Sequence, residues 1–382
     1  MSEIIELTKK LVQIQSENPT GTEREIAVFV KDWFSKIPGV KTETYEVAPD
    51  RPNVIARIEG ESPYPRLACL GHMDTVPAGE GWTKNPFGGE IEQGRLYGRG
   101  ATDMKGGLAV AMMALKNVAL SGKKLKESFL VCATMDEEGV EMLGALDVVA
   151  KKLVEKDTFL IACEPSGLKC GVEHKGVIWY ELITNGIPSH AGNPKVGANA
   201  IYAMCEAQVA LKKAFDGMSE ESVRVGRPTV TVSRMEGGHK TNVVPDRARC
   251  EMDVRIPVPM EIDEITEKMK EIISAAISDS RITWTLRQFN IDRPPVVAPE
   301  DSPLTEALAK AYEKHMGRSM EYFGLAAYTD SSIISARTEN PYGYVFGPGI
   351  LELAHTADEY VPVQELEDSV KILTDMVFNL LA

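Results

Sequence analysis

Strand-length apolar runs alternate with helical patterns through the first 170 residues, and this alternation constrains the fold more than any other feature. Runs expected to form strands span residues 53–60, 66–72, 128–134 and 158–164. Helical patterns at 104–120 and 142–153 separate them, and two amphipathic helices are expected before them, at about 3–14 and 22–37, separated by a breaker at 18–21. The alternation predicts an α/β fold with a mostly parallel sheet.

A different order of elements follows near residue 177. Strand, helix, strand, strand, helix and strand succeed one another, which is the β-α-β-β-α-β order of a ferredoxin-like unit. Beyond Pro294 and Pro295 the α/β pattern resumes, with helices expected at about 303–315 and 363–381. We therefore expect a catalytic domain of residues 1–176 and 294–382, interrupted by an α+β domain of residues 177–293.

Charge and cysteine content narrow the class of protein. A formal net charge of −14 with no run of Lys and Arg argues against nucleic acid as a partner. The N-terminal residues mix charged with apolar side chains, unlike a signal peptide. No apolar stretch approaches the roughly 20 residues of a membrane span, so no membrane association is expected. The six cysteines lack C-x-x-C spacing, which favours a reducing cytoplasm.

Three of the predicted strands end in histidine or acidic side chains. His72 ends one, with Asp74 two residues later on the same face, and Glu164 ends another. The third is followed by Asp136, Glu137 and Glu138. Because the carboxyl ends of parallel strands meet at one edge of a sheet, these groups are expected to converge. For His72 and Asp74 considered alone, the alternative is a structural pair whose hydrogen bonds are satisfied. For Glu137 and Glu138 considered alone, the alternative is an acidic pair on the surface.

Two further residues complete the candidate set. Asp103 opens the helix at 104–120, where helix capping is the alternative role, and His355 lies in a glycine-rich loop after a short strand. Clustered carboxylates without basic partners need a cation. Two imidazoles and several carboxylates suit zinc, and their number suits two metal ions bridged by a carboxylate. If one glutamate of the adjacent pair binds metal, the other can act as a general base.

Seven motifs, in order, resemble the dizinc aminoacylase and carboxypeptidase G family, which includes acetylornithine deacetylase and succinyl-diaminopimelate desuccinylase. They are GHMDTVP, GRGATDMKGGLA, TMDEEGV, CEPSG, IPSHAG, GGHKTNVVP and GPGILELAHTADEY. The resemblance implies that His72 and Glu164 hold one zinc, that Glu138 and His355 hold the other, and that Asp103 bridges them. It also implies that Asp74 orients His72, that Glu137 is the general base, and that the Asp103–Met104 peptide is cis. Cobalt or manganese could occupy the same ligands.

The same resemblance assigns the inserted domain as a lid and dimerisation domain. It implies a homodimer in which His190 reaches the partner's active site and stabilises an oxyanion; a histidine in a turn is the alternative. Asn242 and Arg255 resemble substrate-holding positions, with a solvated strand arginine as the alternative for Arg255. Lys175 stands where several relatives carry Arg. Gly349 would let the backbone approach the substrate closely.

These residues predict a metal-dependent hydrolase that cleaves the amide bond of N-acyl amino acids. A di- or aminopeptidase or carboxypeptidase on the same dizinc site is the alternative, because an acyl and an aminoacyl group differ mainly in the pocket that holds them. A non-catalytic binding protein that keeps the fold is a third hypothesis. It is disfavoured because every expected ligand and the expected base are present.

Overall fold

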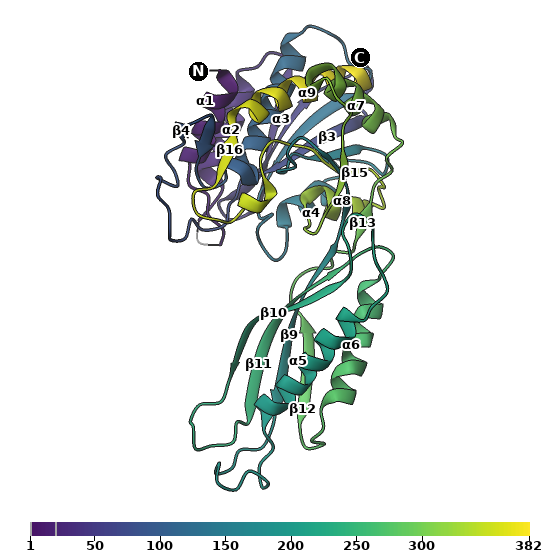
Figure 1. The fold of residues 1–382 in the computed structure, drawn as a ribbon. Coiled ribbons are helices and arrows are strands. Elements are labelled where there is room, and N and C mark those ends of the chain that lie inside the picture. Colours follow the sequence, from purple (N-terminus) through teal and green to yellow (C-terminus); the bar gives the residue numbers. More distant parts are fainter. Residues whose placement is uncertain (1, 20) are drawn as a thin grey trace. The chain divides into compact units, whose positions relative to one another are not determined.

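The computed structural model describes residues 2–19 and 21–382, so Thr20 of the expected breaker lies outside the described residues (Figure 1). The chain divides into two compact units. The first unit contains Met1–Glu173, Val297–Phe323 and Thr329–Ala382, and the second contains His174–Val296 and Gly324–Tyr328. The short segment Gly324–Tyr328 was not among the residues expected in the inserted domain.

The first unit is built on a nine-stranded sheet whose centre is parallel. The strand order is β1-β2-β6-β3-β7-β15-β8-β13, and β14 pairs with β8. Strands β6, β3, β7 and β15 pair in parallel, whereas β1, β2 and β8 join the sheet antiparallel. The strands are β1 (Val40–Ala48), β2 (Arg51–Ile58), β3 (Pro65–His72), β6 (Ser128–Thr134), β7 (Phe159–Ala162), β8 (Cys170–His174), β13 (Val296–Val297), β14 (Tyr322–Leu325) and β15 (Gly343–Val345).

Helices cover both faces of this sheet, which confirms the predicted α/β class (Figure 1). Apolar side chains of α1, α2, α3, α7 and α9 share one buried core, while α4 and α8 pack together elsewhere. Their bounds are α1 (Glu3–Gln13), α2 (Arg24–Ser35), α3 (Gly106–Leu120), α4 (Leu143–Ala150), α7 (Pro303–Met316), α8 (Asp330–Thr338) and α9 (Val363–Leu381), with short turns η1 (Ala101–Lys105) and η2 (Leu351–Leu353). Among the described residues, no helix is both long and apolar enough to cross a membrane.

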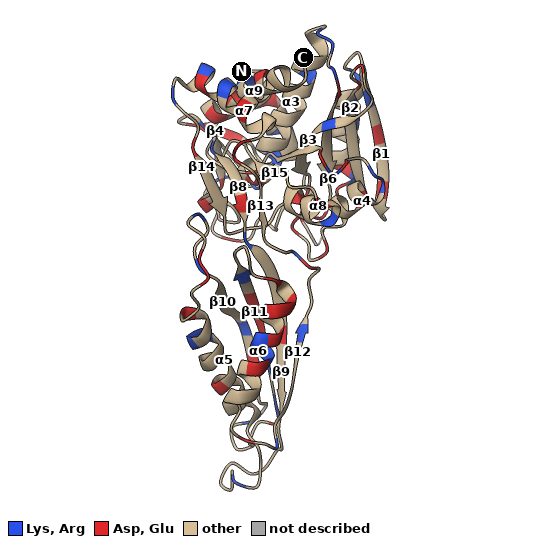
Figure 2. Ribbon diagram, turned by 90° about the vertical axis from the view of Figure 1, so that its right-hand side faces the viewer, with Lys and Arg blue, Asp and Glu red and all other residues tan. Residues whose placement is uncertain are grey.

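The second unit has the predicted β-α-β-β-α-β order. Its four-stranded antiparallel sheet has the order β10-β11-β9-β12. Alternate residues of β11 are buried against the two helices, and α6 keeps its charged residues on the outer side (Figure 2). The elements are β9 (Gly176–Asn185), α5 (Ala200–Asp216), β10 (Thr229–Gly237), β11 (Arg247–Ile256), α6 (Ile262–Ala276) and β12 (Thr283–Gln288).

A small three-stranded sheet links distant parts of the first unit. Its order is β16-β5-β4, formed by Tyr360–Pro362, Arg95–Tyr97 and Glu90–Glu92. The pairing sets Tyr360 opposite Tyr97. The loop that carries His355 therefore ends beside the segment that leads into Asp103. Strands of three residues carry too little periodicity to be predicted from sequence.

The start of α3 packs against the end of β7 at Gly107. A Cβ atom at this position would lie 1.7 Å from the carbonyl oxygen of Cys163, so only glycine fits. Asp103 lies just before this helix and Glu164 just after that strand. The close packing at Gly107 therefore helps to set the separation of these two side chains.

Replacing Gly107 with Ala is expected to destabilise the first unit by about 3 kcal/mol, because an added methyl group overlaps a buried carbonyl. The unfolding midpoint measured by calorimetry tests this. Gly217→Ala is the matched control, since its φ of −93° suits alanine and the nearest atom to the new Cβ lies at 3.4 Å. Equal stability of the two variants would contradict the packing argument.

Candidate metal centre and active site

Parallel pairing aligns the strand ends that carry the predicted site residues. His72 pairs with Thr134 across β3 and β6, and Leu70 pairs with Ala162 across β3 and β7. His72 thus lies beside the turn that holds Glu137 and Glu138, and beside the short segment from β7 to Glu164. Three groups separated in sequence are brought to one edge of the sheet.

Asp103 lies between the two histidines. Its Oδ1 is 3.2 Å from His72 Nε2, and its Oδ2 is 3.3 Å from His355 Nε2. Each imidazole also faces one glutamate: His72 Nε2 is 3.8 Å from Glu164 Oε1, and His355 Nε2 is 3.1 Å from Glu138 Oε1. The five side chains form two adjacent groups that share one carboxylate, the arrangement expected for two bridged metal ions.

Ligand atoms of His72, Asp103 and Glu138 all lie within 4.8 Å of one another. Imidazole nitrogen and carboxylate oxygen are ligands that zinc accepts. The other two members differ in exposure: Glu164 is buried, whereas the His355 side chain is 52% exposed. The donor set fits a divalent metal centre with one side open to solvent.

Burial, together with the neighbouring charges, sets the pKa values of the groups in this centre. Burial raises the pKa of Glu164 and of Glu137 well above the usual value. Burial also acts to raise the pKa of Asp103, but hydrogen bonds to His355 and His72 outweigh it and hold that pKa below its usual value. The same contact with Asp103, together with Glu138, raises the pKa of His355 to about 10. Positive charge stabilises these carboxylates, and bound metal ions would supply it in place of protons.

The orientation of His72 comes from a main-chain carbonyl. Its Nδ1 donates to the carbonyl oxygen of Asp74 at 2.9 Å, while the nearest oxygen of the Asp74 carboxylate is 3.6 Å away. A proton on Nδ1 leaves the Nε2 lone pair directed at Asp103 and Glu164. Asp74 thus contacts His72 most closely through its main-chain carbonyl, and the orienting role that the resemblance implies for its carboxylate stays a prediction.

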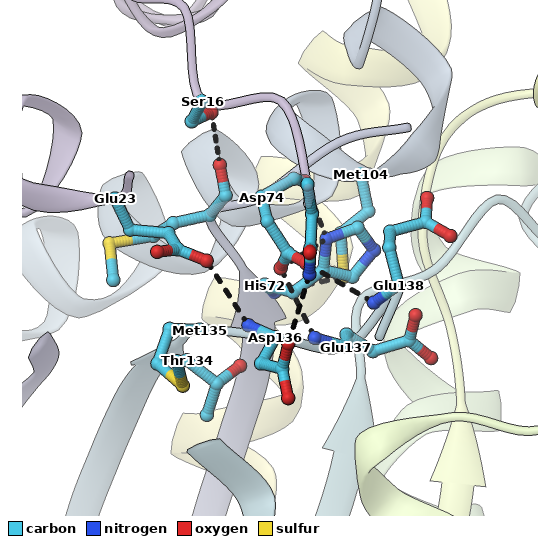
Figure 3. Close-up of polar contacts among 12 residues, drawn as sticks. Ser16, Glu23, His72, Asp74, Met104, Thr134, Met135, Asp136, Glu137 and Glu138 are labelled. Carbon is cyan, nitrogen blue, oxygen red and sulfur yellow. Dashed lines mark hydrogen bonds and ion pairs between the residues drawn. The ribbon is translucent and has the colours of Figure 1, made fainter. Parts of the chain in front are cut away.

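The Asp74 carboxylate instead holds the turn after β6. Its two oxygens accept the backbone N–H groups of Glu137 and Glu138, each at 3.2 Å (Figure 3). Asp74 is fully buried. Because both glutamates belong to this turn, Asp74 fixes the main chain of the predicted base, Glu137, and of the predicted ligand, Glu138.

A buried polar network supports Asp74, and the sequence reasoning missed it. Asn18 donates to the Asp74 carboxylate at 2.9 Å and to Asp136 at 3.0 Å. Arg51 pairs with Asp136 at 3.2 Å and binds Glu23 through two hydrogen bonds of 2.6 and 2.7 Å. Asp136 lies in the TMDEEGV motif shortly after strand β6, and this position was the sequence signal that could have identified it. Nothing local singled out Asn18, Glu23 or Arg51.

Two predicted features of the first unit lie next to Asp103. The Asp103–Met104 peptide is cis, as the resemblance implied. Gly349 has a φ of 107°, and a Cβ there would lie 2.3 Å from the hydroxyl oxygen of Thr102. Its N–H donates to Glu365 at 2.8 Å. A side chain at position 349 would therefore displace the residue that precedes Asp103.

The remaining predicted residues belong to the second unit. His190 is exposed and its Nδ1 accepts the N–H of Gly192 at 3.0 Å, while the carbonyl of Asn242 accepts the N–H of Ala191. These two positions thus lie on adjoining loops. The Arg255 guanidinium binds the carboxylate of Asp253 at 2.6 and 2.8 Å. The buried Lys175 ammonium donates to the carbonyl of Arg227.

Comparison with known proteins identifies the family of this chain. The chain is 28% identical over 387 aligned residues to a probable succinyl-diaminopimelate desuccinylase of Staphylococcus aureus, covering 94% of this chain and 93% of the relative. Its fold matches a M20 family metallo-carboxypeptidase from Sulfolobus solfataricus, with a TM-score of 0.81, 19% identity, and coverage of 100% of this chain and 99% of that one.

A Bacillus subtilis protein described as a dinuclear metal binding peptidase from the M20 family also matches. Its TM-score is 0.74 at 17% identity, with 99% of this chain and 96% of that chain covered. The profile of peptidase family M20/M25/M40 matches residues 68–379. The chain therefore belongs to peptidase family M20/M25/M40 and is a metal-dependent hydrolase of carbon–nitrogen bonds.

Proposed function

We propose that this chain hydrolyses the amide bond of N-acyl amino acids, as a desuccinylase- or deacetylase-like enzyme. One observation carries the proposal: Asp103 lies between His72 and His355, each of which also faces a glutamate. The name of the staphylococcal relative supports a succinylated or similar N-acyl substrate. Small molecules, rather than nucleic acid or membrane, are the proposed partners.

Two zinc ions are the proposed cofactors, and cobalt or manganese could occupy the same positions. His72 and Glu164 would hold one ion, Glu138 and His355 the other, and Asp103 would contact both. When bound, the ions would lower the pKa of water and polarise the scissile carbonyl. The Nδ1–H bond from His72 to the carbonyl of Asp74 supports this assignment, because it leaves Nε2 free to bind metal.

Glu137 is the proposed general base. Its carboxylate would accept a proton from the attacking water, whose oxygen forms a bond to the acyl carbon. As the C–N bond breaks, the same carboxyl would give that proton to the amine nitrogen. The hydrogen bond from the Glu137 N–H to the buried Asp74 carboxylate holds the Glu137 main chain in place for this role.

We propose Asn242, Arg255, Lys175 and Gly349 as substrate contacts. Arg255 donates to the Asp253 carboxylate through Nε and Nη2, and its Nη1 donates to the carbonyl of Ala326. A substrate carboxylate would have to compete for this guanidinium or share it with Asp253. The contact of the Gly349 backbone with substrate is proposed from the resemblance, since its positive φ and its packing against Thr102 explain the glycine without a substrate.

A homodimer is proposed as the active form. Strand β10 is an edge of the second unit's sheet, and it exposes Val232 and Met235. The adjoining helix α5 exposes Tyr202 and Val209, each 70% accessible. An unpaired strand beside apolar side chains favours burial against a second copy. We further propose that His190 serves the partner's site, and that the protein is cytoplasmic, which its six free cysteines support.

A di- or aminopeptidase, or a carboxypeptidase, is the second candidate function. The metallo-carboxypeptidase among the matching structures favours it. The two functions use the same bond-breaking groups: a di- or aminopeptidase requires a free amine on the residue before the scissile bond, a carboxypeptidase requires a peptide on that side, and the deacylase requires a simple acyl group.

A substrate panel tests the proposed function directly. Metal-loaded protein should release acid from N-succinyl-diaminopimelate, N-acetylornithine or a related N-acyl amino acid, with lower kcat/KM for unblocked dipeptides. Activity confined to peptides with a free amine would reject the deacylase proposal and favour the peptidase. Metal-free protein prepared with a chelator is the control.

Glu137→Gln should lower kcat by about 10²- to 10⁴-fold, because the neutral amide cannot accept a proton. Metal content, measured by elemental analysis, should stay at the wild-type value, since Glu137 is not a proposed ligand. Glu339→Gln is the matched control in the same unit, because Glu339 is exposed and its ion pair in the described part of the chain is with the surface ammonium of Lys156. Unchanged turnover in Glu137→Gln would reject the proposed base.

Mixing two inactive variants tests the proposed dimer. Glu137→Gln and His190→Ala homodimers should both be weak, but a mixed dimer would hold one site with Glu137 and the partner's His190. Co-expression in equal amounts should therefore restore about one quarter of wild-type activity. No restoration, with mixed dimers demonstrated by differently tagged subunits, would contradict the shared site.

A further inference from the structure

Glu359 is a fully buried carboxylate that the functions above leave unexplained. Its side chain is 0% exposed, and it lies four residues after His355, immediately before β16. The carbonyl oxygen of Glu359 accepts the N–H of Gly98 at 2.9 Å, next to the pairing of Tyr360 with Tyr97. The main chain at Glu359 is thus joined to the start of the Asp103 segment.

The Glu359 side chain accepts four hydrogen bonds from that segment. Oε1 accepts the N–H groups of Thr102 at 2.9 Å and of Asp103 at 3.0 Å. Oε2 accepts the N–H of Gly100 at 3.2 Å and a guanidinium N–H of Arg99. One carboxylate therefore gathers donors from four of the five consecutive residues that end at Asp103.

Arg99 neutralises this buried carboxylate and is itself held in place. Its side chain is 2% exposed, its Nη2 donates to the carbonyl of Ala78 at 3.1 Å, and its guanidinium carbon lies 5.3 Å from the ring centre of Trp82. A buried ion pair with further hydrogen bonds keeps one geometry, because moving either partner would leave a charge uncompensated.

We infer that Glu359 is a positioning residue for the metal centre, which fixes the main chain of Asp103 relative to the His355 loop. The inference rests on the proposed metal site. Asp103 contacts both histidines, so a displacement of its N–H alters both halves of the centre. Among the described residues, the hydrogen bonds of the Glu359 carboxylate come from three backbone N–H groups and the Arg99 guanidinium, so it reaches Asp103 through the main chain and not through the Asp103 side chain.

The chemistry of the four donors requires a carboxylate. An ionised glutamate only accepts hydrogen bonds, and it has lone pairs for all four N–H groups. Glutamine has nearly the same shape, but its NH2 group would face N–H donors on one side. Glu359→Gln therefore changes the hydrogen bonding with little change of volume.

Cobalt(II) titration of metal-free protein tests the inference. We expect Glu359→Gln to weaken binding of at least one ion tenfold or more and to change the visible absorption of bound cobalt. Wild-type affinity together with a wild-type spectrum would overturn the inference. If Glu359→Gln does not fold, Glu359→Asp is measured in the same way, since the shorter side chain keeps the charge but cannot reach all four donors.

Asn340→Ala provides a control for stability alone. Asn340 is buried in the first unit and donates to the carbonyls of Glu155 and Thr158, so its loss should lower the unfolding midpoint without changing the cobalt spectrum. A spectral change in Asn340→Ala equal to that in Glu359→Gln would reduce Glu359 to a structural role and overturn the inference. If wild-type protein binds no cobalt, the proposed metal site fails. If wild-type protein binds cobalt and Glu359→Gln binds it with the same affinity and spectrum, this inference alone fails.

Discussion

The sharing of one carboxylate by two imidazoles is the contact on which the rest of this structure depends. Asp103 places one oxygen toward His72 and the other toward His355, and a glutamate faces each imidazole. Such crowding of acidic groups is unfavourable without positive charge. The fold therefore has to bring these side chains together and also supply, or bind, the cations that neutralise them.

Hydrogen bonds from backbone N–H groups to buried carboxylates fix the segments that carry the residues of this centre. Asp74 accepts the N–H groups of Glu137 and Glu138, and Glu359 accepts that of Asp103. In both cases a carboxylate that is not a proposed ligand fixes the main chain of a proposed ligand, Glu138 or Asp103, and Asp74 also fixes the main chain of the proposed base, Glu137. This explains how a site made largely from turns and loops can be placed accurately on a parallel sheet.

Sequence patterns predicted the elements well where each signal was local. The continuous apolar runs ending at His72 and Glu164, and the β-α-β-β-α-β order of the second unit, required only periodicity and chain order. The contacts of Asn18, Arg51 and Glu359 join residues far apart in the chain, so no local pattern marks them. The place of Asp74 after a strand was predicted. Its hydrogen bonds to the N–H groups of Glu137 and Glu138 were not, because they depend on how the turn after β6 folds back toward β3.

Anomalous X-ray diffraction from crystals of the zinc-loaded protein tests the central claim most directly. Data collected on both sides of the zinc absorption edge should give two peaks about 3.5–4 Å apart. One should lie among His72, Glu164 and Asp103, and the other among Glu138, His355 and Asp103. Absence of zinc from these residues, or an imidazole of His355 that contacts no ion, would contradict the account.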